Sequence, residues 1–158
     1  LKNHDNLEKL LSIVKIDISE FVTISIKRHP YEKALSQAKW NVVKHKYLKE
    51  GIRVSPNKDD VMSMLDKLYK NKKIKAINNW PIYSYDNKYK IDIMLDFNEL
   101  DNLEETLGSK FNFGPLKIPQ LKKFDNKQEL RISMIPEDIK KYIQEICSEE
   151  FEKFKYER

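Results

Sequence analysis

The residues from Arg28 to Ser36 carry the arrangement best suited to chemistry with an anion. An alternating apolar stretch ends at Lys27, Arg28 follows it directly, and Pro30 stands two residues later. Proline fits the first position of a helix because its ring presets φ and its missing N–H would be unbonded there. A guanidinium offers a planar fork of donors suited to phosphate, and a helix start adds backbone N–H groups and the positive end of its dipole. The pattern outlines an anion site, although an ordinary strand-to-helix connection with an exposed arginine has the same appearance.

The full segment, Arg-His-Pro-Tyr-Glu-Lys-Ala-Leu-Ser, resembles a motif of the sulfotransferases, especially of the carbohydrate sulfotransferases. In that family the arginine and the serine bind the 3'-phosphate of the sulfate donor, 3'-phosphoadenosine 5'-phosphosulfate. The resemblance therefore implies that Arg28 and Ser36 bind this cofactor. Lys33 stands where the family often has arginine.

Two further stretches resemble the same family. Residues 91–100 are similar to a late strand that ends in an aromatic residue followed by Glu-x-Leu, with Asn98 in the usual Glu position. Residues 135–156 are similar to the closing helix, with Glu150 in the position of an aspartate. The resemblance extends from about His4 to Tyr156, and its specific part is the segment from Arg28 to Ser36.

A second cofactor element of the family, a loop rich in Gly, Ser and Thr that holds the 5'-phosphosulfate, is missing from the sequence. Such a loop needs glycine where the backbone takes positive φ and approaches the anion. The three glycines are Gly51, Gly108 and Gly114, and all follow Arg28. We therefore expect a single sulfotransferase-like domain over residues 1–158, truncated at its N-terminus and belonging to a longer protein or to a natural remnant.

The composition fits one soluble domain with a core. The 158 residues are 40% hydrophobic and 35% charged, and the formal net charge is +5. No run of about 18 apolar residues exists, so we expect no membrane span and a cytoplasmic protein. Cys147 is the only cysteine, which excludes an internal disulfide, and the three histidines lack the spacing of a zinc site, so no metal is expected.

Apolar spacing predicts helices and strands in an α/β order. Helices are expected over residues 6–16, from Pro30 to a stop at Gly51, after a cap at Ser55-Pro56, near 101–110, and at the end of the chain. Strands are expected over residues 20–27, with Val22, Ile24 and Ile26 on one face, and over 90–97. The fold class is therefore α/β, a small and mostly parallel sheet flanked by helices, and the resemblance implies part of a P-loop-like sulfotransferase fold.

Three further groups of residues have both a structural and a functional interpretation. Trp80, Tyr83 and Tyr85 could line an acceptor site, but aromatic residues are also ordinary core residues. The lysine-rich residues 71–75 form either a binding patch or a solvated turn. Lys122 and Lys123, in a segment expected to be a loop, could reach a cofactor phosphate or lie in solvent.

The resemblance implies transfer of a sulfuryl group from 3'-phosphoadenosine 5'-phosphosulfate to a hydroxyl or amine acceptor, with a glycan favoured by analogy. Such a reaction needs a base near the acceptor, and the sequence does not single one out. Glu32, His45 and Glu50 are better explained as surface charges. The catalytic residues are therefore unassigned, and we expect this chain alone to bind the nucleotide weakly and to turn over little.

Two other functions stay open at the level of sequence. One is a sulfotransferase-like domain that has lost catalysis and serves in assembly, which the missing loop favours. The other is a basic module that binds nucleic acid, which the net charge permits. Against the second, the charges are spread along the chain and 25 residues are acidic.

Overall fold

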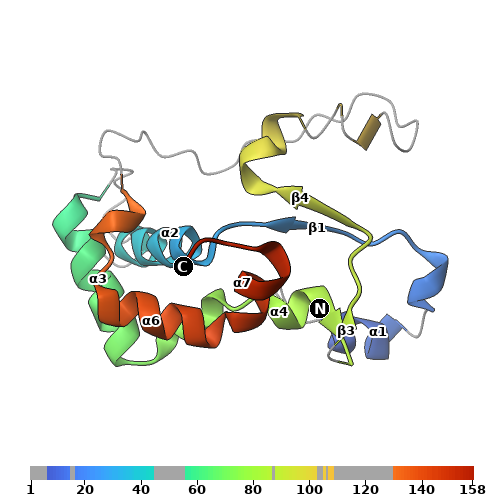
Figure 1. Cartoon of the computed structure of the whole chain (residues 1–158), viewed down its shortest axis with the longest axis horizontal. Helices are drawn as coiled ribbons and strands as arrows, with labels where there is room; N and C mark the ends of the chain where they lie inside the picture. Colours follow the sequence, from blue (N-terminus) through green and yellow to red (C-terminus); the bar gives the residue numbers. More distant parts are fainter. Residues whose placement is uncertain are drawn as a thin grey trace. The chain divides into compact units, whose positions relative to one another are not determined.

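A computed structural model describes residues 7–14, 17–44, 56–86, 88–102, 105, 107–108 and 130–158 (Figure 1). The chain divides into two compact units, Leu1–Arg28 with Tyr83–Lys123 and His29–Ile82 with Phe124–Arg158. The described residues of the first unit form helices and strands, and those of the second form helices. The single domain expected over residues 1–158 stays a prediction, because contacts in the folded state do not decide whether the two units fold independently.

The first unit contains a parallel pair of strands. Strand β1 (Ile24–Lys27) pairs with β4 (Ile93–Asp96), and the register joins Ile24 to Ile93 and Lys27 to Asp96. The two strands run side by side in Figure 1. The prediction of mixed helix and strand with a small parallel sheet is confirmed.

Shorter elements complete the first unit. Strands β2 (Ser84–Tyr85) and β3 (Lys88–Tyr89) form an antiparallel pair. Helix α1 spans Leu7–Val14, and 3-10 helices span Ile18–Glu20 and Phe97–Asn102. Tyr83 is buried, and its hydroxyl donates a hydrogen bond of 3.0 Å to the carbonyl of Ile26. This bond ties the segment before β2 to β1.

Thr23 and Asp92 hold the two parallel strands together where they begin. The backbone N–H of Thr23 donates to Asp92 Oδ2 at 2.8 Å, and the N–H of Ile93 donates to the carbonyl of Thr23 at 3.0 Å. Thr23 Oγ1 lies 2.7 Å from Asp92 Oδ2 and 2.6 Å from the carbonyl oxygen of Lys90. The hydrogen bonds from the backbone and hydroxyl of Thr23 lower the pKa of Asp92, because they favour its charged form.

The apolar face predicted for the first strand is present, but it faces solvent. Ile24 and Ile26 alternate with less exposed residues, and each is 41% exposed. Val22 precedes the strand, which is shorter than the predicted 20–27, and it is exposed as well. Within the described residues only β4 pairs with β1, and two strands offer little to cover a face.

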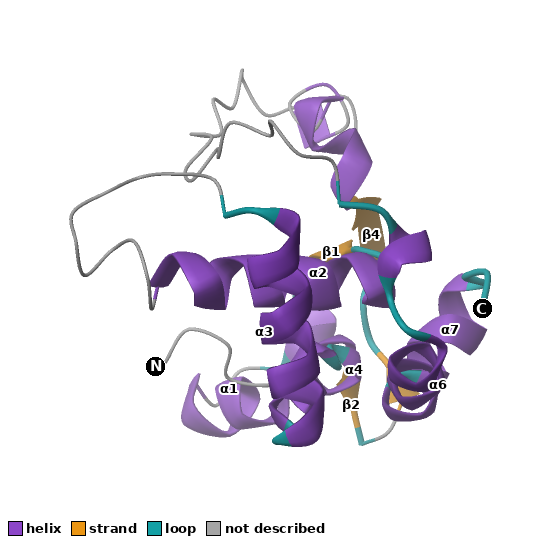
Figure 2. Cartoon of the chain, turned by 90° about the vertical axis from the view of Figure 1, so that its left-hand side faces the viewer, coloured by secondary structure: helices purple, strands orange, loops and turns teal. Residues whose placement is uncertain are grey.

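The second unit is built from helices around one hydrophobic core. Its main helices are α2 (Pro30–Val42), α3 (Lys58–Lys70), α6 (Glu137–Ile146) and α7 (Ser148–Phe154). It also contains the 3-10 helices η4 (Lys73–Ile77) and η6 (Ile132–Met134). The short helix α4 (Trp80–Tyr83) includes the point in the sequence, after Ile82, where the chain passes from the second unit to the first. Helices α2 and α3 cross in Figure 2. Helices α2, α3, α6, α7 and η4 contribute to the core, which contains Tyr31, Ala34, Leu35, Ala38, Val61, Leu65, Leu68, Ile74, Ile77, Ile135, Ile139, Ile143, Cys147 and Phe151.

Several predicted boundaries differ from those in the structure. Helix α3 is capped by Asn57, whose side-chain oxygen accepts the N–H of Asp60 at 2.7 Å, so the cap predicted at Ser55-Pro56 is wrong. The closing helix is interrupted at Cys147, where φ is −117° and ψ is 24°. The predicted stop at Gly51 and the loop over residues 115–127 lie outside the described residues.

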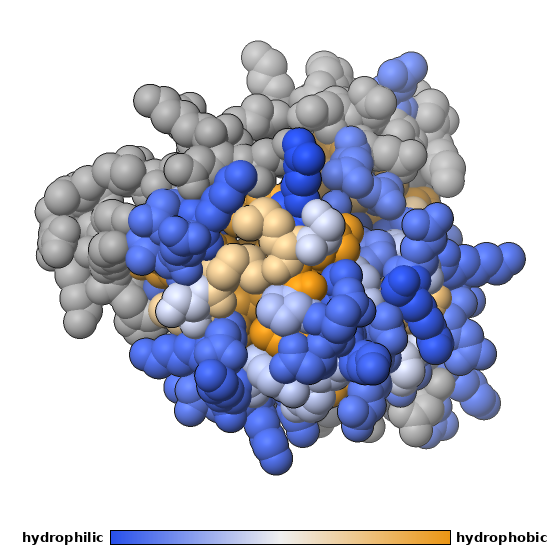
Figure 3. Space-filling view, turned by 60° about the vertical axis from the view of Figure 1, so that its left-hand side comes forward, coloured by the Kyte–Doolittle hydropathy of each residue, from blue (hydrophilic) through white to orange (hydrophobic). Residues whose placement is uncertain are grey.

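On the face drawn in Figure 3, hydrophilic side chains cover most of the described surface, with hydrophobic atoms gathered near the centre. Within the described ranges, every helix is too short or too polar to cross a membrane.

Candidate anion-binding site

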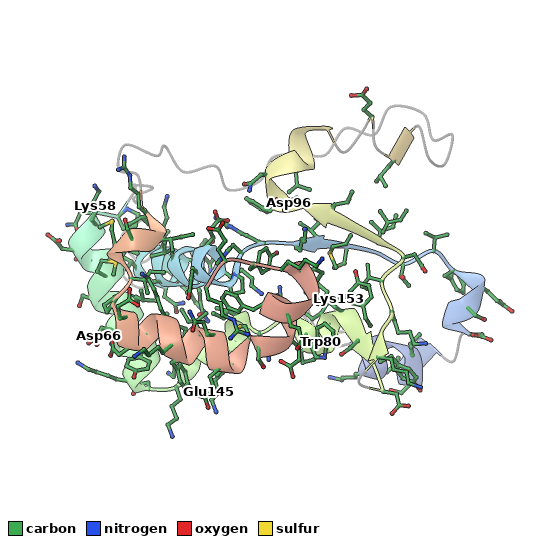
Figure 4. The ribbon with its side chains drawn as sticks, in the orientation of Figure 1. Lys58, Asp66, Trp80, Asp96, Glu145 and Lys153 are labelled. Carbon is green, nitrogen blue, oxygen red and sulfur yellow. The ribbon has the colours of Figure 1, made fainter. Side chains whose placement is uncertain are left out.

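The carboxyl ends of β1 and β4 bring charged and aromatic side chains together in the first unit. Lys27 and Asp96 are register partners, and Lys27 Nζ lies 3.8 Å from Asp96 Oδ2. Figure 4 labels Asp96 at the end of β4. Ligands of open α/β sheets bind beyond the carboxyl ends of the strands. Arg28, the next residue after Lys27, lies at the carboxyl end of β1, and its role in binding an anion stays a prediction.

Arg28 contacts an aromatic ring at this strand end. Its Cζ lies 4.3 Å from the ring centroid of Phe97, which follows Asp96 directly. Arg28 is partly buried, and Phe97 is 42% exposed. The guanidinium therefore lies against a ring that is itself partly exposed to solvent.

In the second unit, the start of α2 matches the prediction. Pro30 is the first helical residue and is buried. His29 caps the helix, and its Nδ1 accepts the backbone N–H of Tyr31 at 3.2 Å. Proline has no N–H, and the N–H of Tyr31 is already bonded, so this helix start offers fewer backbone donors to an anion than the sequence alone implies.

Ser36 lies on α2 in the second unit, with its side chain exposed to solvent. The other side of α2 packs in the core through Ala34, Leu35 and Ala38. The serine hydroxyl is therefore available to a ligand. Arg28 and Ser36 belong to different units, and their joint role in binding stays a prediction.

A buried ion pair ties α2 to α7. Lys33 Nζ lies 2.8 Å from Oε1 and 2.6 Å from Oε2 of Glu150, and the two side chains are 10% and 0% exposed. The backbone N–H of Asn79 also donates to Glu150 Oε1 at 2.7 Å. The buried carboxylate therefore has hydrogen-bonding partners on both oxygens, as a buried charge requires.

Aromatic rings surround His29 beside this ion pair. Its ring centroid lies 5.0 Å from that of Tyr31, 5.6 Å from that of Phe151 and 4.7 Å from that of Tyr156. His29 Nε2 lies 3.2 Å from the carbonyl oxygen of Glu157. With Nδ1 accepting from Tyr31, the bonds fit a neutral ring with its proton on Nε2. Burial lowers the pKa of His29, because it disfavours the charged form.

The remaining candidates of the sequence are distributed over several environments. Tyr83 is a core residue, Trp80 is partly buried, and Tyr85 is exposed. The lysines at 72, 73 and 75 are exposed on and beside η4. Glu32 lies on α2 and is partly buried, whereas His45, Glu50, Lys122 and Lys123 lie outside the described residues.

Neither a metal centre nor a reactive thiol emerges from the described residues. Within that part of the chain, no three His, Cys, Asp or Glu side chains form a group that could hold a metal ion. Burial raises the pKa of Cys147 to about 12, with a further contribution from the charge of Glu150. The thiol therefore stays protonated, in agreement with its predicted role as a small apolar residue.

Phe97, Lys33 and Glu150 were not assigned a role by the sequence. A signal existed for Glu150, because it continues the apolar stripe of Ile139, Ile143 and Cys147 at helical spacing. A carboxylate at such a position must be buried with a partner. No comparable signal identifies the partner, because Lys33 is distant in sequence.

Comparison of the chain with protein-family models, with curated proteins and with solved structures gave no match.

Proposed function

We propose that this chain is part of a sulfotransferase of the carbohydrate type. In this proposal Arg28 and Ser36 bind the 3'-phosphate of 3'-phosphoadenosine 5'-phosphosulfate, and the sulfuryl group passes to a hydroxyl or amine acceptor. A glycan is the acceptor favoured by analogy with the family that the sequence resembles. The proposed fold is the corresponding part of a P-loop-like sulfotransferase domain.

The observation that carries the proposal is that the stretches resembling this family contact one another within each unit. In the first unit, Arg28 from the motif lies against Phe97 from the late strand. In the second unit, Lys33 from the motif pairs with Glu150 from the closing helix. A chance likeness of short stretches would not require these contacts.

The chemistry of the named side chains fits a terminal phosphate. Arg28 supplies a permanent positive charge and a planar set of donors, and Ser36 supplies one hydroxyl donor. Transfer of a charged group depends mainly on alignment and on stabilisation of developing charge. The role proposed for these two residues is to fix the nucleotide, which sets the position of the group to be transferred.

Calorimetric titration with adenosine 3',5'-bisphosphate and with AMP tests the proposal. The bisphosphate is expected to bind more tightly than AMP, because only the bisphosphate carries a 3'-phosphate. A hydrogen bond to a charged group contributes about 1.5–3 kcal/mol, so Arg28→Ala should weaken bisphosphate binding by about 10- to 150-fold. Ser36→Ala should weaken it in the same direction, and AMP binding should change little in both variants.

Arg131→Ala is the matched control, because it removes the same charge from an exposed residue beside η6. If Arg28→Ala and Arg131→Ala lose the same affinity for the bisphosphate, the effect comes from net charge alone, and the proposal is contradicted. Equal affinity of the unmodified chain for the bisphosphate and AMP would contradict it as well. Sulfate transfer to a panel of glycans then tests the acceptor class.

A further inference from the structure

Positive charge is concentrated around the turn between α3 and η4. Residues 67–75 contain five lysines and no acidic residue, whereas charge elsewhere in the chain is mixed. In Figure 2 this turn lies at the lower end of α3. All five lysines are exposed, and we call the surface that they form the basic turn: Lys67, Lys70, Lys72, Lys73 and Lys75. Part of the net charge of the chain is therefore gathered on one surface of the second unit.

The hydrophobic core fixes the outward direction of these lysines. Leu68, Ile74 and Ile77 take the inward positions of the segment and are 6%, 0% and 4% exposed. The lysines between them are left on the solvent side. Among the residues that the structure describes, Lys70 pairs with Asp66 at 2.7 Å, and the other four lysines of the basic turn form no ion pair. Those four ammonium groups keep their charge and their donors for a ligand.

Local structure accounts for only part of this lysine pattern. Lys67 and Lys70 lie in the last turn of α3, where the helix dipole favours a positive charge. Lys72 has left-handed backbone with a φ of 55°, which glycine and asparagine adopt more readily than lysine. Lys73 begins η4, and a positive charge is unfavourable at a helix start. The fold favours lysine at neither of these last two positions, which is expected where a ligand selects the charge.

The side chains of the turn narrow the class of ligand. Within residues 67–75, all of which the structure describes, no large apolar side chain is exposed, so the turn has nothing to insert into a bilayer. Tyr69, its one aromatic residue, is partly buried, and its ring centroid lies 5.4 Å from that of Tyr142. It therefore offers no open face for the bases of a single strand. Lysine contacts phosphate as a point charge and lacks the planar fork with which arginine reads a base edge.

Nearby carboxylates favour a narrow ligand over a flat one. Asp66 pairs with Lys70, and the charge of Asp138 acts on the same lysine. A flat anionic membrane would meet these carboxylates together with the lysines. A nucleic-acid strand instead carries its phosphates along a line, which the lysines can follow while the carboxylates stay in solvent.

We propose that the basic turn binds the phosphate backbone of a double-stranded nucleic acid, independently of base sequence. This inference goes beyond the proposed function and uses neither Arg28 nor the nucleotide. Each ammonium group that neutralises a phosphate releases a counterion, so the affinity falls as salt is added. With the four lysines that form no ion pair, log Kd should rise by about 3.6 for each tenfold increase in salt concentration.

Fluorescence anisotropy of labelled duplexes measures this salt dependence on the full chain. Two short DNA duplexes of unrelated sequence should bind equally, because the lysines contact the backbone alone. Their affinity should fall about 150-fold between 50 and 200 mM salt. An RNA duplex of the same length carries the same kind of backbone, and the tighter of the two duplex types identifies the source of the ligand.

A triple variant of the turn, Lys72→Gln with Lys73→Gln and Lys75→Gln, removes three of the proposed phosphate contacts. It should lower the salt slope by about 2.7 and weaken binding to both DNA sequences alike. The matched control removes the same net charge from exposed lysines elsewhere and should leave the slope near 3.6: Lys88→Gln, Lys90→Gln and Lys155→Gln.

Three results would overturn the inference. The first is the absence of salt-dependent binding to any of the duplexes. The second is an equal loss of slope in the two triple variants, which would reduce the effect to net charge. The third is tighter binding to single-stranded DNA, to heparin or to phosphatidylcholine vesicles that contain phosphatidylserine, which would assign the basic turn to another class of polyanion.

Discussion

The substitution Glu150→Gln tests how strongly the buried ion pair stabilises the second unit. Glutamine has nearly the same shape and still accepts the N–H of Asn79, but it leaves the ammonium of Lys33 without a charged partner. Breaking a buried pair from one side costs about 3–5 kcal/mol. Lys33 keeps 10% of its surface exposed, so we expect a loss near the lower end, about 3 kcal/mol in the free energy of unfolding. For a chain of this length, that corresponds to a fall in Tm of about 6–12 °C.

Urea unfolding followed by far-UV circular dichroism measures the loss. The matched control is Glu137→Gln, because Glu137 and Lys140 are also 2.6 Å apart but have side chains 76% and 19% exposed. That variant should lose about 0.3–0.5 kcal/mol, as exposed helix pairs do. Equal losses in the two variants would refute the argument from burial.

The double variant Lys33→Met with Glu150→Gln separates the charge from the packing. It removes both charges and keeps an acceptor for Asn79, so it should be more stable than Glu150→Gln alone. A double variant that is as unstable as the single one would mean that the lost stability comes from packing, and the cost assigned to the unpaired ammonium would be wrong.

Two further predictions concern helix starts. Because the pKa of His29 is lowered from its ordinary value near 6.5, the neutral ring is favoured in the folded chain, so stability should fall as pH drops below about 6.5 and level off below the pKa of the folded state. Unfolding at a series of pH values should show a weaker dependence in this range for His29→Asn, and an unchanged dependence would contradict the role of the ring. Asn57→Ala should lower the free energy of unfolding by about 0.5–2 kcal/mol, because it removes the side chain that caps α3. Asn57→Asp should retain most of the stability, because aspartate also accepts the N–H of Asp60. Similar unfolding midpoints for the two variants would argue against the cap.

The sequence was most informative where local chemistry decides the structure. Pro30 predicts the start of a helix, and α2 begins at this residue. The helical spacing of apolar residues from Leu7 to Val14 predicts a helix, and α1 is present there. The cap of α3 was misplaced by two residues, because Ser55, Pro56 and Asn57 all favour a helix start and the sequence does not rank them. Choices among similar local signals are made by the packing of the whole unit.

Contacts between distant residues were beyond the reach of local patterns. Glu150 could be recognised as a buried acid from its apolar stripe, but its partner is set by the way α7 meets α2. The same holds for Phe97, whose ring lies against Arg28 only because β1 and β4 pair in one register. The exposure of Ile24 and Ile26 likewise depends on what covers the strand, which alternation alone does not state.

The unequal burial of the two units affects how ligands of this chain should be sought. Of the eight large apolar side chains that are exposed among the described residues, only Trp40 lies in the second unit, which also holds the hydrophobic core. Heat-induced loss of helical signal will therefore report chiefly on the second unit, and we expect local opening of the first unit to cost less free energy. A compound that binds at Arg28 could leave the melting temperature unchanged and still slow amide hydrogen exchange in β1 and β4. Screening this chain by thermal shift alone would discard such a ligand, and exchange measurements would retain it.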